Sequence, residues 1–172
     1  MGINDKNFDE RNKKARLAEL RFIEKFTNKD WFIIEYGIHM EEKDNDKFWG
    51  LPKIIQKTPD FICWKPEDKK NPIFVEHKTC GKHWLALKHE QHIEYKRWNT
   101  LMPVWYAIEI QFWDSDGSIK YADVLIDWNS MEKLAQQSLT ANDGKMQPFP
   151  NNTNGSKVHY PILTNTIISI MR

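Results

Sequence analysis

Three side chains on two neighbouring segments have the types and spacing needed to hydrolyse a phosphodiester bond. Asp60 lies sixteen residues before Glu76, and Lys78 completes a Glu-x-Lys triplet. The segments 58–64 and 73–79 are rich in β-branched and aromatic residues, which is typical of strands. The segment between them contains Pro, Asp and Asn and is predicted to be a turn. The sequence therefore predicts a β-hairpin that brings Asp60 near Glu76.

Two carboxylates and one ammonium group then converge at one edge of a sheet. Side chains alternate along a strand, so Glu76 and Lys78 share a face while His77 points the other way. Carboxylate oxygens are the ligands that Mg²⁺ prefers, and the backbone carbonyl of His77 is placed to complete the metal shell. A metal held there can polarise a phosphodiester, and Lys78 can orient the attacking water or stabilise charge in the transition state. The alternative is an ordinary surface ion pair between Glu76 and Lys78.

The two strand segments also resemble a known family of nucleases. TPDFICW (58–64) and NPIFVEHKT (71–79) are similar to the catalytic hairpin of the PD-(D/E)XK superfamily, most of all to phage and archaeal Holliday-junction resolvases. The resemblance implies a restriction-endonuclease-like fold, cleavage of DNA with Mg²⁺ (or Mn²⁺ in its place), and a homodimer that cuts two strands symmetrically. Branched DNA is the expected substrate. A sequence-specific restriction or homing endonuclease and an inactive DNA-binding module of the same fold are the alternatives.

A glutamate in the first predicted helix is the fourth catalytic candidate. Glu19 lies twelve residues before Trp31, which is the spacing that the resemblance implies for a further metal ligand. It is in line with the apolar positions of the helix, where an unpaired carboxylate needs an explanation. Glu24 is the competing candidate and is expected to face solvent.

The segment after the Glu-x-Lys triplet is predicted to contact DNA. Residues 84–98 fit a helix in which Lys88, Gln91 and Tyr95 fall on one face. Helices with a similar Gln-x-x-x-Tyr pattern occur in several branches of the superfamily, which implies that this face adjoins the active site. The alternative is a solvated helix face. The predicted DNA contacts are Lys82, Lys88, Gln91, Tyr95 and Arg97.

The order of elements indicates an α/β (α+β layered) domain around a mixed central sheet. We expect one domain over residues 1–172, with its core at about 8–139 and a polar excursion with a C-terminal edge strand over 140–172. Residues 39–57 are predicted to be a long loop or a loosely formed hairpin. Helices are predicted over 8–27, 84–98 and 129–137, and strands over 31–38, 58–64, 73–79, 102–113, 118–127 and 158–170.

Composition narrows the remaining classes of function. The net charge of +1 excludes a polycation, so DNA binding must come from a local patch such as the basic stretch 78–100. Cys63 and Cys80 are expected to be free thiols of a reducing compartment. No apolar stretch predicts a membrane span or a secretory signal, so we expect a cytoplasmic protein, with a composition compatible with a phage gene.

Two further interpretations remain open. The histidines His89 and His92, three apart on the predicted helix, are an alternative zinc pair without the third ligand that such a site needs. The eight tryptophans are expected to pack in the core. The alternative is that a few of them stack on bases or on a protein partner.

Overall fold

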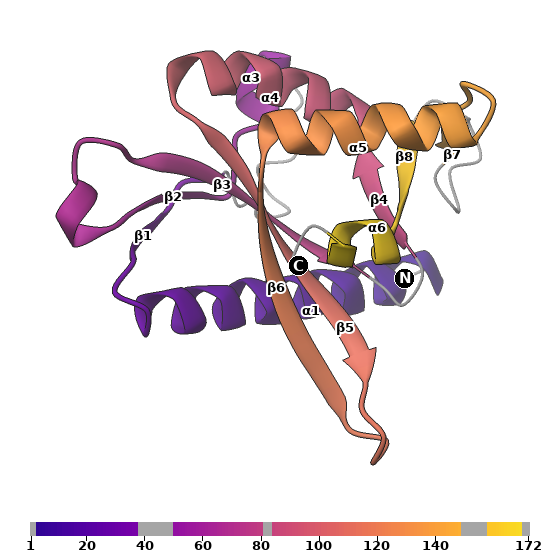
Figure 1. Ribbon diagram of the computed structural model, residues 1–172, viewed down its shortest axis with the longest axis horizontal. Helices are drawn as coiled ribbons and strands as arrows, with labels where there is room; N and C mark the ends of the chain where they lie inside the picture. The colour runs from indigo at the N-terminus through magenta and orange to yellow at the C-terminus, as the bar shows by residue number, and fades with distance from the viewer. Residues whose placement is uncertain (1–2, 38–49, 81–83, 149–157, 170–172) are drawn as a thin grey trace.

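A mixed five-stranded sheet forms the centre of the molecule, in a computed structural model that describes residues 3–37, 50–80, 84–148 and 158–169. In spatial order its strands are β1 (Phe32–Glu35), β2 (Phe61–Trp64), β3 (Ile73–Cys80), β5 (Val104–Trp113) and β6 (Ile119–Asp127). β3 and β5 are parallel, and the other neighbours are antiparallel. Figure 1 shows helix α1 (Ile3–Thr27) on one side of this sheet, and α4 (His89–Leu101) and α5 (Trp128–Ala141) on the other. The predicted mixed α/β architecture with a central sheet between helices is confirmed.

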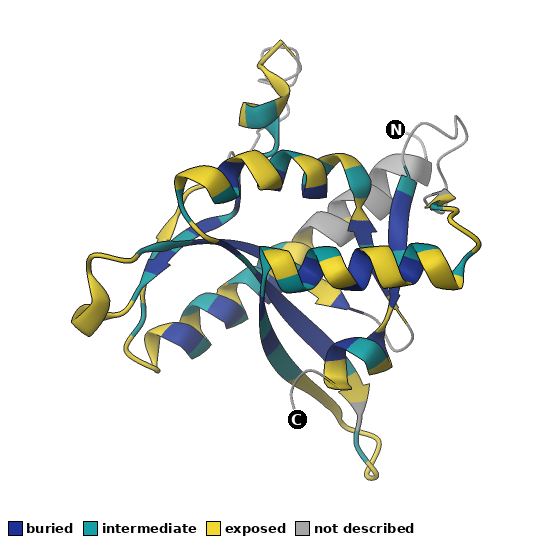
Figure 2. Cartoon of the chain, turned by 45° about the horizontal axis from the view of Figure 1, so that its top comes forward, coloured by how far each residue is buried: buried dark blue, intermediate teal, exposed yellow. Residues whose placement is uncertain are grey.

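Each face of the sheet has its own core. Helix α1 places Ala18, Phe22 and Phe26, spaced four residues apart, on its buried side. The ring of Phe22 lies 5.1 Å from that of Phe61 on β2, which anchors the helix under the strands. The predicted amphipathic helix over 8–27 is confirmed and begins earlier, at Ile3. On the opposite face, α4 and α5 pack over the strands, and their buried residues line the inner side in Figure 2.

A second, three-stranded sheet was not predicted. Its strands, in spatial order, are β4 (Trp84–Lys88), β8 (Val158–Leu163) and β7 (Gln147–Pro148). It packs into the same core as α4 and α5, through residues such as Leu85 and Ile162. β8 is its middle strand, so the prediction of a C-terminal edge strand was wrong.

The prediction of a helix over 84–98 was wrong in its first turn. Residues 84–88 form β4, and the helix begins only at His89. Leu85 and Leu87 are buried while Trp84 and Lys88 are exposed, which is the alternation of a strand. This alternation was readable in the sequence, but pairing with β8, some seventy residues away along the chain, is what makes the segment a strand.

The remaining predictions were met in part. The helix predicted over 129–137 is α5, and the strands over 102–113 and 118–127 are β5 and β6. Much of the predicted loop 39–57 lies outside the described residues, but its end forms a short helix, α3 (Lys53–Gln56). A single helical turn, η2 (Pro66–Asp68), lies in the hairpin turn, and α6 (Thr164–Ser169) follows β8. Within the described residues, no helix is long and apolar enough to cross a membrane.

Candidate active site

The register of the hairpin puts Asp60 and Glu76 in one row. Phe61 of β2 pairs with Val75 of β3, so the residue before Phe61 lies opposite the residue after Val75. The backbone N–H of His77 donates a hydrogen bond of 2.8 Å to Oδ2 of Asp60. The two carboxylates therefore meet where β2 begins, as the predicted hairpin required. We call the three predicted catalytic residues on these strands, Asp60, Glu76 and Lys78, the catalytic row.

A glycine that the sequence analysis did not single out fixes the backbone of Asp60. The carbonyl oxygen of Asp60 accepts hydrogen bonds from the N–H groups of Tyr36 (2.8 Å) and Gly37 (2.9 Å). A Cβ atom at Gly37 would lie 3.2 Å from Cα of Asp60, which is closer than side chains normally pack. Glycine therefore suits this close approach of two backbones, because any side chain would require the backbone of Asp60 to shift by a few tenths of an ångström. Its place inside the strand predicted over 31–38 is the sequence signal that could have pointed to it, because a glycine within a strand often marks a close backbone approach.

Three donors hold the carboxylate of Glu76, which is 1% exposed. Oε1 accepts hydrogen bonds from the ammonium of Lys78 and from Nε2 of Gln91, the latter at 2.8 Å. Oε2 accepts a hydrogen bond from the hydroxyl of Tyr95, which also lies 2.7 Å from Nε2 of Gln91. Because Gln91 and Tyr95 are four residues apart on α4, one helix face supplies both contacts.

The catalytic row contains two carboxylates, Asp60 and Glu76, and one cation, Lys78, and this imbalance shifts their pKa values. Burial raises the pKa of Asp60 well above its usual value, and the neighbouring charge of Glu76 raises it further. Burial alone would lower the pKa of Lys78, but the charges of Glu76 and Asp60 outweigh it, and the net shift is upward. Lys78 is thus held as an ammonium ion, and Asp60 retains its proton to a higher pH than a free aspartate.

Glu19 lies within electrostatic range of the row, but it is not unpaired as the sequence suggested. Its charge raises the pKa values of both Asp60 and Lys78, as a minor contribution in each case. One turn earlier on α1, Arg16 donates a 3.0 Å hydrogen bond to Glu19 and also binds Glu35. The side chain of Glu19 is 18% exposed. The arginine is why a carboxylate is tolerated here.

Some of the predicted DNA contacts face solvent and others do not. Lys88 is exposed, but it ends β4 and caps α4, so it does not share a helix face with Gln91 and Tyr95 as predicted. Arg97 is exposed and pairs with Glu94 at 3.1 Å. Tyr95 is 0% exposed, so it holds Glu76 and does not reach the surface to touch DNA. Lys82 lies outside the described residues.

The side chains of His77 and His92 contact other side chains of the core. The ring of His77 faces α1, 5.5 Å from Phe22, and burial lowers its pKa to about 4. The ring nitrogens of His92 lie 2.6 Å from the hydroxyl of Tyr106 and 2.6 Å from a carboxylate oxygen of Glu132. Both nitrogens of His92 therefore have hydrogen-bond partners in the core, which leaves none for the alternative zinc site.

The donor chemistry of the row fits a Mg²⁺ ion. Within the described part of the chain, no three Asp, Glu, His or Cys side chains form a complete metal cluster. Mg²⁺ does not require one, because it keeps several waters and typically takes only one or two protein carboxylates. A divalent cation between Asp60 and Glu76 would offset the repulsion that raises the pKa of Asp60.

Comparisons with known proteins leave the family open. No protein-family model matches the chain, and no curated protein matches it. Among solved structures it is similar to Hjc, a Holliday junction resolvase of the archaeal hyperthermophile Archaeoglobus fulgidus. The match has a TM-score of 0.39 and 10% sequence identity, and it covers 69% of this chain and 92% of that one. A similarity at this level assigns no family, so a proposal about function must rest on the geometry of the site.

Proposed function

We propose that this protein is a Mg²⁺-dependent endonuclease that hydrolyses phosphodiester bonds in DNA. The observation that supports the proposal is the catalytic row itself. Asp60 and Glu76 are two carboxylates placed together, with Glu76 buried and Asp60 partly buried, and Lys78 is their cation. Burying like charges side by side is unfavourable, and such arrangements occur where chemistry uses them.

The residues of the catalytic row would have different roles in the reaction. Asp60 and Glu76 would hold the cation, with Glu19 and the backbone carbonyl of His77 as further ligands, directly or through water. When bound, Mg²⁺ supplies positive charge to the phosphate oxygens and lowers the pKa of a bound water. Lys78 remains protonated, so it acts by donating hydrogen bonds to the attacking water or the phosphate and not by accepting a proton.

Gln91 and Tyr95 keep Glu76 in a fixed orientation. Burial raises the pKa of Tyr95 well above its usual value, with the charge of Glu76 as a second cause. The phenol therefore stays neutral and donates its proton to Oε2 of Glu76. Partners of this kind orient a metal ligand and typically change metal affinity or activity 10- to 100-fold when removed, in order-of-magnitude terms.

We propose branched DNA, such as a four-way junction, as the preferred substrate and a homodimer as the active form. The support is the hairpin motif around Asp60 and Glu76, which resembles that of junction-resolving endonucleases. Symmetric cleavage of two strands requires two active sites related by a twofold axis.

The test is a cleavage panel with purified protein. Duplex, single-stranded, flap and four-way-junction DNA are each incubated with Mg²⁺, with Mn²⁺ and with EDTA. We expect metal-dependent cleavage that is fastest on the junction and absent with Asp60→Asn. Activity that survives in EDTA, or no cleavage of any substrate with either metal, contradicts the proposal. Cleavage of duplex at fixed sequences would replace the branched substrate with a recognition site.

A further inference from the structure

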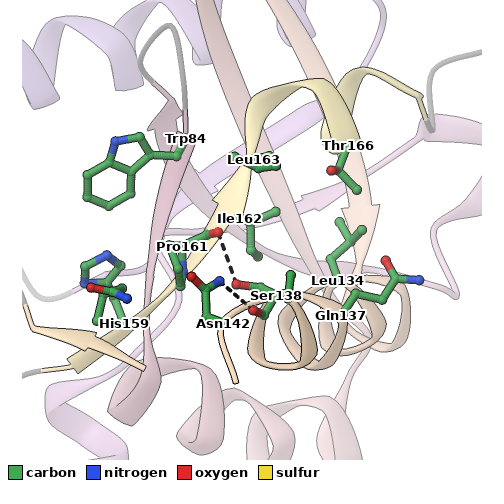
Figure 3. Close-up of a pocket in the computed structure, with 12 residues that line it drawn as sticks. Trp84, Leu134, Gln137, Ser138, Asn142, His159, Pro161, Ile162, Leu163 and Thr166 are labelled. Carbon is green, nitrogen blue, oxygen red and sulfur yellow. Dashed lines mark hydrogen bonds between the residues drawn. The ribbon is translucent and has the colours of Figure 1, made fainter. Parts of the chain in front are cut away.

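A pocket separate from the catalytic row lies between α5, α6 and strand β8, with a cavity volume of about 710 Å³ (Figure 3). This is within the range of small-molecule sites. The strand β4, which contributes Trp84, follows the catalytic strand β3 along the chain. Sγ of Cys80, at the end of β3, lies 3.1 Å from Oγ1 of Thr164 at the start of α6. The pocket is thus built onto the far end of the catalytic strand.

An aromatic plane forms one wall of the pocket. The indole of Trp84 stacks on the ring of His159, with the centroids 5.0 Å apart and the planes 20° from parallel. Trp84 is 39% exposed although it is a large apolar side chain. Leu134 and Ile162 are among the apolar residues that line the same space. A flat ligand can therefore stack on Trp84 and exclude water from this wall.

The polar groups of the pocket are amides and hydroxyls. Ser138 is buried, and its hydroxyl donates to the carbonyl oxygen of Pro161 at 3.1 Å. Nδ2 of Asn142 donates to the carbonyl oxygen of Ser138 at 2.7 Å, which leaves Oδ1 as an acceptor toward the pocket. Among the described residues that line it, none is Asp, Glu, Lys or Arg, and burial lowers the pKa of His159 so that its ring is neutral. The remaining polar lining residues are Gln137, Gln147 and Thr166.

From this lining we propose that the pocket binds a nucleobase, stacked on Trp84 with its edge hydrogen-bonded by the amide of Asn142, which lies nearer to Trp84 than Gln137 does in Figure 3. A phosphate finds no lysine or arginine among the described lining residues, and a purely apolar ligand would form no hydrogen bonds with the amides and hydroxyls of the pocket. A neutral, flat heterocycle can stack on the aromatic wall with its face and form hydrogen bonds with the polar side chains through the donors and acceptors on its edge. Side-chain amides pair with base edges, and tryptophan stacks on any base.

The base can come from a free nucleoside or from an unpaired nucleotide in DNA, and only the second source rests on the proposed nuclease function. The first experiment needs no DNA and no catalysis. In saturation-transfer NMR with the metal-free protein, we expect transfer to the adenine protons of adenosine and none to deoxyribose 5-phosphate. No transfer to adenine, or equal transfer to both compounds, overturns the proposal.

Substitutions of pocket residues test whether adenosine binds in this pocket. Trp84→Ala is expected to weaken adenosine binding about 10-fold, while Trp84→Phe retains it. Asn142→Ala, at the C-cap of α5, is expected to weaken it about 5-fold and guards against misfolding of the Trp84 variants. The matched control is Phe32→Ala, because Phe32 is a half-exposed aromatic residue that stacks on Trp64 far along the chain, outside the pocket. Equal losses in Phe32→Ala and Trp84→Ala contradict the assignment.

A second experiment identifies the source of the base. A duplex with one unpaired 2-aminopurine is added to the protein in EDTA, where stacking on Trp84 should quench the fluorescence. Quenching that disappears in Trp84→Ala identifies unpaired DNA as the ligand. Adenosine binding without quenching keeps the nucleobase site and identifies free nucleosides as the source. An inactive nuclease that still binds adenosine would contradict the proposed function and not this pocket.

Discussion

Two groups of charged side chains lie on opposite faces of the central sheet, and their charge balance differs. On the α1 side, Arg21 binds Glu109 through two hydrogen bonds of 2.8 and 2.6 Å, and Lys25 pairs with Asp123. Each carboxylate there has its own cation. On the α4 side, Asp60 and Glu76 share the single cation Lys78.

Under the proposed function, this difference separates a structural from a functional use of the same residue types. A carboxylate with a matched cation stabilises the fold if its geometry is good. An ionised carboxylate close to a second one is destabilised by repulsion, and this repulsion contributes to the raised pKa of Asp60. We therefore expect substitutions in the catalytic row to change activity more than stability, and substitutions in the α1-side pairs to do the reverse.

The largest effect is expected from Asp60→Asn. Loss of a metal ligand removes several kcal/mol of transition-state stabilisation, which corresponds to about 10³-fold slower cleavage. Asp123→Asn is the matched control, with cleavage per folded molecule unchanged and the free energy of unfolding reduced by about 2 kcal/mol, because Lys25 loses its partner. Cleavage assays and urea denaturation of both variants make the comparison. If Asp60→Asn cleaves at the wild-type rate, the catalytic row has been misassigned.

Lys78→Ala is expected to slow cleavage by about 10²–10³-fold, the range for removal of one group that stabilises developing charge. DNA affinity, measured in Ca²⁺ or EDTA, should change far less. Lys25→Ala, in the α1-side pairs, should leave single-turnover rates unaltered. A Lys78→Ala protein whose only defect is weaker DNA binding would make the lysine a phosphate contact instead.

Tyr95→Phe is expected to raise the Mg²⁺ concentration needed for half-maximal cleavage by about 10-fold or more, since Glu76 loses one of its three donors. Tyr106→Phe provides the control because Tyr106 is an equally buried phenol whose hydroxyl contacts His92 and not Glu76. It should reduce stability by about 1 kcal/mol without changing the Mg²⁺ requirement. Equal shifts in the two variants would show that Tyr95 acts through packing alone.

The smallest effect concerns stability against pH in the metal-free protein. The folded-state pKa of Asp60 is above its unfolded value, so the folded state binds more protons between the two values. Stability from this group is present below the usual Asp pKa of about 3.9 and is lost as pH rises through the folded pKa. The stability of wild type relative to Asp60→Asn should thus fall with pH, by at most about 1.4 kcal/mol per pH unit. Urea unfolding in EDTA at several pH values measures it, and a difference that stays constant argues against a shifted Asp60.

Local patterns were sufficient for the hairpin and the first helix. The β-rich runs on either side of a polar turn are enough to predict a hairpin in which Asp60 can lie near Glu76, and the observed register, with Phe61 opposite Val75, brings them together. The spacing of Ala18, Phe22 and Phe26 likewise determines which side of α1 is buried. These patterns involve residues close to each other in the sequence, so they can be predicted from the sequence alone.

Long-range contacts decided the rest. Whether residues 84–88 are helix or strand depends on β8, and the partners of Glu76 on α4 follow from the parallel crossover between β3 and β5. The sequence by itself determined the chemistry of the row: two carboxylates and a lysine on one hairpin. Only the tertiary structure decided that Arg16 also binds Glu35, that Gly37 approaches Asp60, and that a pocket without Asp, Glu, Lys or Arg among its described lining residues forms beside Trp84. Each of these features brings together segments that are far apart along the chain. No periodic pattern in the sequence predicts such contacts, because packing and charge act through space.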